Sequence, residues 1–493
     1  MKFAYLLLLF VTAFIFGCKK EEDPPKEKPP PKLFYEASFS IKKPCFQDIS
    51  DTIQFIDSTL LFINQSRWTA LYPDTIPTNP DTNQVKTYKW DFGDNTSSTS
   101  QHASHVYSLP GTYQISLVTF LNNVPSDTFS TNVRIIVGQR EIKTNYTYTT
   151  CVDIEEAGGN NILLLLSSFN SYSDPPSYSL MKLDSLLKTV WIKTIPGNNI
   201  RLNSLKKTIN NEYILSGNYA SGNTDQFAIT RINANGDLIW TKYINNLSGK
   251  NVHTTLTSDG FLLTIGDTTN SLNPFPVVVK CTVDGDEIWR RSFNTGIGSS
   301  VRSPDNIIEI SNGYLFAATK PGSSNSKIVL TSLDHDGNII QQVETDAGNT
   351  GTIFRTGVVK NGSGYMVYAT NTLMLYFFSD NLALSSSGQL PLTTGMNHAV
   401  SYNGSYYLAE GNHQYSNIIK LSANGSSIWY ATIWNRIPLS CLSIYSGVTR
   451  YCKKVLCTTN DVFALSYGQN NTNVFNSSSV YVEKFNHSEG RIK

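Results

Sequence analysis

The feature that most constrains the fold is an internal repeat that starts near residue 140 and runs to the end of the chain. Each copy has an apolar segment after a turn, followed by a second apolar segment with a hairpin signature. Seven copies of the first segment align, at residues 160–168, 211–219, 259–267, 312–320, 363–371, 404–412 and 460–468. A period of about 50 residues is typical of stacked units, none of which can bury its apolar faces alone.

The second segment of most copies carries a pair of turn residues and a tryptophan. The pairs are Asn235-Gly236, Asp284-Gly285, Asp336-Gly337 and Asn424-Gly425. Such pairs supply positive φ at both centres of a type I′ turn, so we expect a tight hairpin at each. The tryptophans in equivalent places are Trp191, Trp240, Trp289 and Trp429. We expect them to pack between units, because equivalent positions in a ring cannot all face one ligand pocket.

The repeat unit predicts a four-stranded antiparallel blade, made of these three strands and a preceding strand such as 201–209. Neighbouring blades must cover each other's apolar faces, and the series must then close into a ring. The sequence therefore predicts a seven-bladed β-propeller over residues 140–493. Its last copy stops at 490–493, where an outer strand should begin, so residues 140–148 are expected to pair beside 480–485.

These copies resemble a Bacteroidota repeat with the pattern W-I-V-K-L-D-x-N-G-x-I-x-W-x-K, followed by D-G-G-Y-I-V-A-G. They are also similar to the strand–turn–Trp unit of quinoprotein propellers, and the resemblance covers nearly all of 150–493. Three copies depart from it. The first has Leu187 in place of the glycine, the fourth has Gln341 in place of the tryptophan, and the fifth lacks both.

Residues 34–138 predict a separate β-sandwich of short strands. Trp90 and Phe92 alternate with Asp91 and Gly93, which places the aromatic rings on one face. The segment closely resembles the PKD domain, an immunoglobulin-like sandwich with the pattern W-D-F-G-D-G … H-x-Y-x-x-P-G-x-Y. Its residues here are Trp90, Asp91, Phe92, Gly93, Asp94, His105, Tyr107, Pro110, Gly111 and Tyr113, with Asn95 replacing the final glycine of the first motif.

Asp91 and Asp94 could be ligands for calcium or a glycan, or acceptors for turn N–H groups. We favour the second interpretation, because two carboxylates fall short of the 6–8 oxygens that calcium takes. His105 is interpreted as structural. The whole chain is thus expected to be all-β, with an N-terminal immunoglobulin-like sandwich followed by the propeller.

The N-terminus predicts export and lipidation. Residues 3–16 form an apolar run too short to span a bilayer, and Ile15-Phe16-Gly17-Cys18 resembles the bacterial lipobox. This implies that 1–17 is a signal peptide and that Cys18 is acylated; an ordinary cleaved signal and an anchor helix are the alternatives. Residues 18–33 form a disordered linker of charge and proline.

The acidic stretch Glu21-Glu22-Asp23 of this linker resembles the export signal of Bacteroidota surface lipoproteins. We therefore expect the protein at the outer membrane and facing outward, with the periplasmic face as the alternative.

The net charge and the cysteine pattern bear on whether the chain binds nucleic acid, a metal or a cofactor. The net charge is +1 with scattered Lys and Arg, which gives no basic face for nucleic acid. A hairpin turning at Ser446-Gly447 would place Cys441 opposite Cys452, so we predict a disulfide there; Cys151 with Cys457 is a weaker possibility. No CxxC or His-x-x-x-His accompanies the cysteines, so neither metal nor cofactor is expected.

The leading functional hypothesis is a non-catalytic envelope lipoprotein that binds a polysaccharide or protein through propeller loops. The rival is a propeller enzyme acting on extracellular glycans, and a purely structural envelope component is the third. The sequence lacks a sialidase Asp-box, G-x-S-x-G and H-E-x-x-H. Glu155 and Glu156 should point to opposite faces of a strand, so no catalytic residue is assigned.

Overall fold

The computed structural model describes residues 33–42, 53–55, 59–70, 86–142, 144–171, 173–197, 199–221, 224–268, 275–293, 306–320, 326–347, 356–362, 364–369, 374–389, 396–411, 416–432, 448–472, 475–485 and 487. Every regular element in these ranges is a β-strand, so the expected all-β class is confirmed. A search of the same residues found no apolar helix of membrane-spanning length. The chain forms two compact units, and the propeller lies wholly in the second, which includes Asn132–Lys493.

The N-terminal strands form three sheets. One pairs β1 (Leu33–Glu36) with β5 (Arg67–Ala70), and another has the order β2 (Phe39–Lys42), β4 (Thr59–Asn64), β8 (Ala103–Val106). The five-stranded sheet has the order β3 (Ile53–Phe55), β10 (Val124–Ile136), β9 (Gly111–Leu121), β6 (Lys86–Asp91), β7 (Ser97–Ser98).

Aromatic rings fill the core of these sheets, as the alternation predicts. Trp90 and Phe92 are buried while Asp91 and Gly93 are exposed. The Trp90 ring centroid lies 5.0 Å from that of Phe39 and 5.8 Å from that of Phe62, and its indole N–H donates to the Ser100 carbonyl at 2.9 Å. A β-sandwich built around an aromatic centre follows from this arrangement.

Seven four-stranded blades form the second unit, in which the innermost strand of each blade comes first in the chain. Blade 1 is β12 (Tyr148–Glu156), β13 (Ile162–Phe169), β14 (Ser177–Leu183), β15 (Thr189–Ile195). Blade 2 is β16 (Ile200–Lys207), β17 (Tyr213–Ser221), β18 (Thr224–Ile232) and the first part of β19 (Leu238–Leu256). Blade 3 is the second part of β19, β20 (Leu262–Thr268), β21 (Pro276–Cys281), β22 (Glu287–Ser292).

The remaining blades follow the same order. Blade 4 is β23 (Ile307–Ile310), β24 (Gly313–Lys320), β25 (Lys327–Leu333), β26 (Ile339–Asp346). Blade 5 is β27 (Thr356–Asn361), β28 (Gly364–Ala369), β29 (Met374–Ser379), β30 (Leu384–Gln389). Blade 6 is β31 (Met396–Tyr402), β32 (Ser405–Gly411), β33 (Ser416–Ser422), β34 (Ser427–Thr432). Blade 7 has β35 (Val448–Cys457), β36 (Val462–Thr472) and β37 (Phe475–Phe485).

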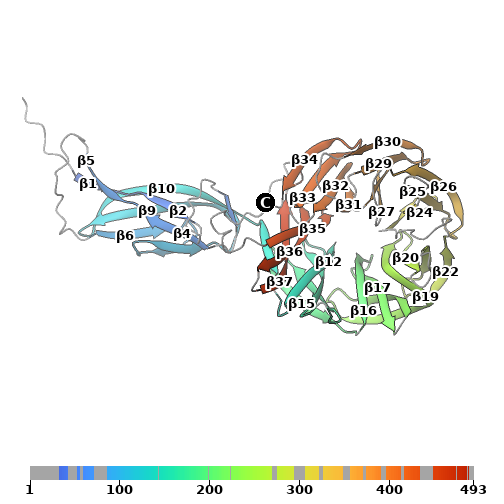
Figure 1. The fold of residues 1–493 in the computed structure, drawn as a ribbon. Coiled ribbons are helices and arrows are strands. Elements are labelled where there is room, and N and C mark those ends of the chain that lie inside the picture. Colours follow the sequence, from blue (N-terminus) through green and yellow to red (C-terminus); the bar gives the residue numbers. More distant parts are fainter. Residues whose placement is uncertain are drawn as a thin grey trace, which may run out of the picture. The chain divides into compact units, whose positions relative to one another are not determined.

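Blade 7 takes its outer strand from the other end of the repeat region. Strand β11 (Gln139–Ile142) pairs antiparallel with β37, with Arg140 opposite Val482 and Ile142 opposite Val480. The blades thus close into the ring seen in Figure 1, where β12 lies beside the red C-terminal strands. The predicted closure is confirmed for residues 140–142, and the expected seven-bladed propeller is present.

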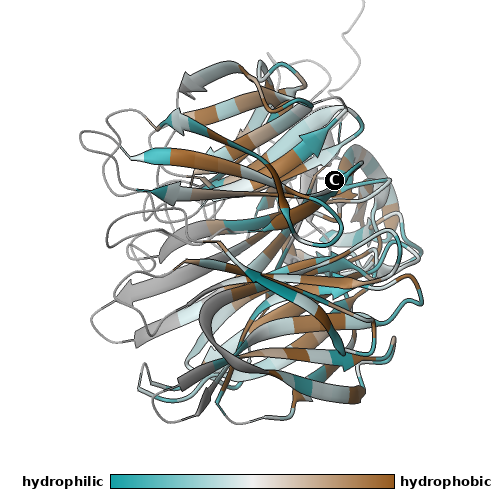
Figure 2. Cartoon of the chain, turned by 90° about the vertical axis from the view of Figure 1, so that its right-hand side faces the viewer, coloured by the Kyte–Doolittle hydropathy of each residue, from teal (hydrophilic) through white to brown (hydrophobic). Residues whose placement is uncertain are grey.

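The core of the ring lies between blades rather than within them. Each apolar cluster joins two neighbours: one includes Leu163 and Leu165 of blade 1 with Leu215 of blade 2, and another joins Phe463 and Leu465 of blade 7 to blade 1. Figure 2 shows apolar segments along the middle of the blade strands and hydrophilic residues at their ends. Burial of both faces of every blade therefore requires a neighbour on each side.

The hairpin turns differ from the predicted type. The Gly236 N–H donates to the Asn233 carbonyl at 2.9 Å, and Gly236 has a φ of 80° while Asn235 does not have positive φ. The expected type I′ turn is therefore wrong: this is a type I turn over residues 234–235 with the glycine in a G1 bulge. The Asn233 side chain accepts the N–H groups of Asn235 and Asp237, which stabilises this form.

In three of these turns the glycine lies against the tryptophan of the preceding blade. A Cβ on Gly236 would stand 2.9 Å from the Trp191 ring, one on Gly285 2.9 Å from Trp240, and one on Gly337 2.9 Å from Trp289. The two repeat residues therefore form one contact between neighbouring blades. This confirms that these tryptophans pack between units.

At two of the three places where the tryptophan is missing, the next blade has a leucine in place of the glycine; after blade 5 the glycine is kept, and Gly425 lies against Phe377. Gln341 of blade 4 is followed by Leu382 in blade 5, and blade 7 is followed by Leu187 in blade 1. Both leucines have positive φ and are buried in clusters between blades. A buried side chain thus occupies space that a tryptophan fills elsewhere, and its burial offsets the strain of the left-handed backbone.

Replacing Gly285 by Ala tests the tryptophan–glycine contact. The new Cβ adds about 1 kcal/mol of backbone strain at φ 80° and meets the Trp240 ring, so we expect a loss of about 2–3 kcal/mol in the free energy of unfolding. Denaturant unfolding measures it. Gly260→Ala is the matched control, since Gly260 has φ 84° and nothing within 4 Å of a Cβ. Equal losses in the two variants would contradict the contact.

Candidate functional site

The innermost strands carry one structurally equivalent position that faces the neighbouring blade. In five of them the register shifts, and the residue just after the shift is Asp153, Ser204, His253, His398 or Lys454. Register with the second strand places Asn306 and Gly357 there in blades 4 and 5. We call this set of seven the inner-ring position.

Most inner-ring side chains hydrogen-bond the backbone of the next blade. Asp153 accepts the Leu205 N–H at 2.9 Å, Ser204 accepts the Thr254 N–H at 3.2 Å, and His398 Nδ1 accepts the Val455 N–H at 3.4 Å. The Asn306 amide both accepts the Val358 N–H, at 2.9 Å, and donates to the Val358 carbonyl, at 2.8 Å. These bonds satisfy backbone groups of the innermost strands, which pair with a neighbouring strand on one side only.

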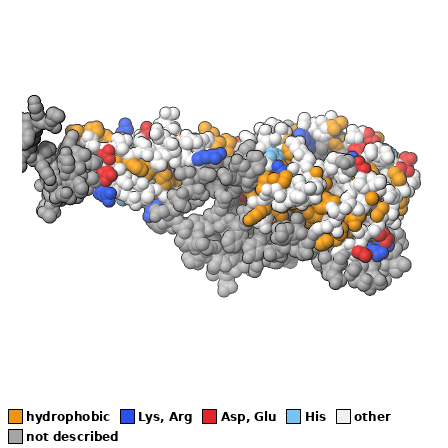
Figure 3. Space-filling view, turned by 90° about the horizontal axis from the view of Figure 1, so that it is seen from above, with side chains coloured by type: hydrophobic (Ala, Val, Ile, Leu, Met, Phe, Trp, Pro, Cys, Tyr) orange, Lys and Arg blue, Asp and Glu red, His pale blue; other side chains and the backbone are white. Residues whose placement is uncertain are grey.

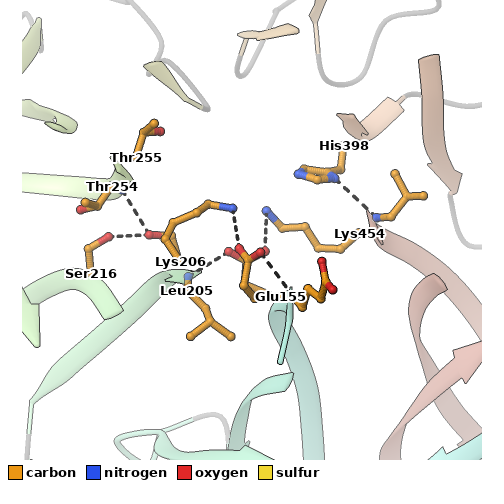
Figure 4. Close-up of polar contacts among 12 residues, drawn as sticks. Glu155, Leu205, Lys206, Ser216, Thr254, Thr255, His398 and Lys454 are labelled. Atoms are coloured by element: carbon orange, nitrogen blue, oxygen red, sulfur yellow. Dashed lines mark hydrogen bonds and ion pairs between the residues drawn. The ribbon is translucent and has the colours of Figure 1, made fainter. Parts of the chain in front are cut away.

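At blades 7, 1 and 2 the inner-ring position becomes part of a charged cluster (Figure 4). The Lys454 ammonium lies 3.4 Å from the Asp153 carboxylate, and the Lys206 ammonium donates to Glu155 at 3.4 Å. One lysine–carboxylate pair thus joins blades 7 and 1, and another joins blades 1 and 2. We take Asp153, Glu155, Lys206, Lys454 and His398 as the candidate functional site, and call them the axial cluster.

The electrostatics of the axial cluster follow from burial opposed by pairing. Burial alone would raise the pKa of Asp153, but the charges of Lys454, Lys206 and His398 and the Leu205 N–H lower it to about 2. Burial raises the pKa of Glu155, against the effect of Lys206. Burial would lower the pKa of Lys206, and the Glu155 and Asp153 carboxylates reverse this and raise it. Asp153 therefore stays ionised, while Glu155 takes up a proton more readily than an ordinary glutamate.

A second set of contacts between blades lies at the turn between the third and fourth strands. Arg231 of blade 2 donates to Glu212 of its own blade at 2.6 Å and to Asp284 of blade 3 at 2.7 Å. Lys484 of blade 7 pairs with Asp461 at 3.0 Å and donates to the Ser185 carbonyl of blade 1 at 3.0 Å. The contact between blades 7 and 1, which closes the ring, therefore has the same kind of side-chain bridge as the contact between blades 2 and 3.

The two faces of the ring differ in the length of their connections. On the face that carries the hairpin turns, the connections have five residues or fewer, for example 157–161, 233–237 and 362–363. The opposite face has the long connections 293–306, 347–355 and 433–447. We call these the short-turn face and the long-connection face.

The sequence-predicted positions fall in different places. Asp91 accepts the Gly93 N–H at 2.9 Å and Asp94 accepts the Thr96 N–H at 3.1 Å, which is the predicted structural role. Asn95 has the left-handed φ of 67° expected at the replaced glycine. His105 packs edge-on against Tyr107 at 4.6 Å. The described residues contain no group of three or more potential metal ligands.

Cys18, the signal peptide, the linker before residue 33 and Cys441 lie outside the described residues. The Cys441–Cys452 disulfide therefore stays a prediction. Cys452 itself is buried on β35, opposite Ser466 of β36.

Sequence reasoning missed the axial cluster. It considered Glu155 only as a neighbour of Glu156, whereas the residues that meet are Asp153 and Glu155 with lysines of two other blades. A signal was available: Lys206 follows Glu155 by 51 residues, close to one repeat. Opposite charges at equivalent places of successive copies indicate a pair across a blade seam.

One stretch of the chain matches a known domain family. Residues 70–135 match the family model of the PKD domain. No curated protein matches the chain in sequence. A quinonprotein alcohol dehydrogenase-like protein from Bacteroides thetaiotaomicron is 13% identical, with a TM-score of 0.40 over 81% of this chain and 96% of that one. The β-propeller domain of the trilobed protease from Pyrococcus furiosus is 10% identical, with a TM-score of 0.42 over 71% and 96%.

A protein of unknown function from Bacteroides caccae is 12% identical, with a TM-score of 0.36 over 52% of this chain and 89% of that one. At such identities the likeness concerns the fold alone. The chain is thus a PKD-type β-sandwich joined to a seven-bladed β-propeller.

The stability of the ring should depend on Asp153 between pH 4 and pH 2. The pKa of this carboxyl falls from 3.8 to about 2 on folding, so its contribution of about 2 kcal/mol is complete above pH 4 and is lost as the pH drops through 2. Unfolding curves from pH 6 to 2 should show Asp153→Asn far below the wild type at pH 6 and close to it at pH 2. Asp237→Asn, at an exposed ion pair, is the control. Parallel curves for wild type and Asp153→Asn would refute the assignment.

Proposed function

We propose that this chain is a cell-envelope lipoprotein that binds an extracellular polysaccharide or protein partner without catalysing a reaction. The acylated Cys18 attaches it to the outer membrane, and the linker holds the folded part outside the cytoplasm, at the cell surface. The propeller supplies the binding face, and the PKD-type sandwich acts as a spacer. A quinoprotein-like repeat type and a Bacteroidota origin are part of the same proposal.

The observation that carries this proposal is the contrast between the two faces of the ring. The recurring motif residues are used in contacts between blades on the short-turn face, as with Trp240 and Gly285 or Arg231 and Asp284. Connections of unequal length, up to 433–447, are left for the long-connection face. Loops that vary in length on a rigid frame are where binding residues are usually found, and we assign the binding face to them.

The charges at the ring axis support a role without catalysis. Glycoside hydrolysis needs two carboxylates that flank one bond, one of them protonated. Asp153 and Glu155 each lie beside a lysine, and Asp153 also accepts a backbone N–H. Both carboxylates are therefore engaged by the protein itself.

An array of polysaccharides, probed with the mature chain without its acylated cysteine (residues 19–493), tests the binding proposal. We expect retention of at least one glycan or envelope protein together with no reducing ends or unsaturated products released from the same glycans. Product release would contradict the proposal in favour of a glycan-active enzyme. Absence of both binding and turnover would contradict it in favour of a structural envelope component.

The anchor is tested by Cys18→Ser. A lipidated chain should partition into the detergent phase and be degraded by protease added to intact cells, whereas Cys18→Ser should move to the aqueous phase because the acyl chains are lost. Cys45→Ser is the control and should behave as the wild type. A Cys18→Ser chain that stays in the detergent phase would show that something other than this cysteine holds it.

A further inference from the structure

Two ammonium groups from two blades converge at the axial cluster. Lys206 comes from β16 and Lys454 from β35. Figure 4 shows the two lysines reaching from opposite sides toward the carboxylates of blade 1, with His398 above Lys454. The Lys206 side chain is 39% exposed and that of Lys454 is 15% exposed. The ammonium groups thus lie at the ring axis with partial access to solvent.

The protein uses only part of the hydrogen-bonding capacity of these lysines. An ammonium has three N–H donors. In the described part of the chain, the nearest carboxylate oxygens are 3.4 Å from both ammonium groups, beyond the usual 2.7–2.9 Å of a charge-assisted bond. The arrangement therefore suits a ligand that offers only acceptors.

We propose that Lys206 and Lys454 form a binding site for a ligand carboxylate, as carried by a uronic acid of an acidic polysaccharide. The ligand carboxylate bridges the two ammonium groups with its two oxygens. This site lies on the inner strands and is separate from the long-connection face to which the proposed function assigns binding.

The charge of the cluster selects a singly charged group. Asp153 and Glu155 nearly neutralise the two lysines, so a phosphate dianion would leave excess negative charge in a partly buried site. A carboxylate adds one charge only. Burial raises the pKa of Glu155. When Lys206 binds the ligand instead, Glu155 can therefore take up a proton and leaves no unpaired buried charge.

Calorimetric titration of the mature chain tests the site. Galacturonate and oligogalacturonate should bind saturably, while the neutral methyl-esterified oligomer should not. Lys206→Met should weaken galacturonate binding at least about tenfold, because a charge-assisted hydrogen bond is lost. Lys206→Arg keeps the charge and should stay within a few-fold of the wild type.

Lys207→Met is the matched control, because Lys207 is the next residue of β16 and points to the other side of the strand. It removes the same charge and should leave galacturonate binding unchanged. Thermal unfolding of each variant, at a midpoint near that of the wild type, shows that the ring is intact.

Three results would overturn the site: no saturable binding of any carboxylate, equal affinity in Lys206→Met and wild type, or equal losses in Lys206→Met and Lys207→Met. Acetate distinguishes the source, since acetate binding as tight as galacturonate would reject a uronic acid in favour of a small free carboxylate. A glycan that binds Lys206→Met unchanged would reject this site while leaving the proposed function intact.

Discussion

Mutual covering of apolar blade faces is the constraint on which this structure depends. A blade such as β16 to β19 has leucines and isoleucines on both faces, and the apolar clusters extend from each blade into the next. The first and last blades can each bury their second apolar face only by packing against each other. It does so with strand β11, which supplies the missing edge of blade 7, and with Lys484, which reaches the Ser185 carbonyl of blade 1.

The irregular copies follow the same constraint. A tryptophan requires a glycine in the following blade, because a Cβ there would meet the ring, whereas blades 4 and 7, which lack the tryptophan, are each followed by a buried leucine. Leu187 fills this place at the contact between blades 7 and 1, where it packs in one cluster with Phe463 and Leu465. Departures from the repeat are therefore compensated at the neighbouring blade, and the sequence of a single copy does not reveal them.

Much of the fold could be predicted because the hairpin glycines and tryptophans recur at nearly constant spacing. The type of turn could not, since the Asn-Gly pair alone does not show that Asn233 begins the turn and that the glycine ends it. The axial cluster was also missed. The inner-ring position holds Asp, Ser, His, Asn, Gly, His and Lys, so no repeated letter marks it, and its partners meet only when blades are placed side by side.

The placement of charge at the ring axis indicates that the axial cluster does more than stabilise the packing between blades. Other seams are held by neutral side chains, such as Ser204 and Asn306, at the same position. Two residues further along the inner strands, blades 4 to 6 carry Ile308, Val359 and Val400, whereas blades 1 and 2 carry Glu155 and Lys206. Burying ions for stability alone gains little over neutral or apolar contacts. Charges concentrated on three adjacent blades are better explained by a ligand that meets them there.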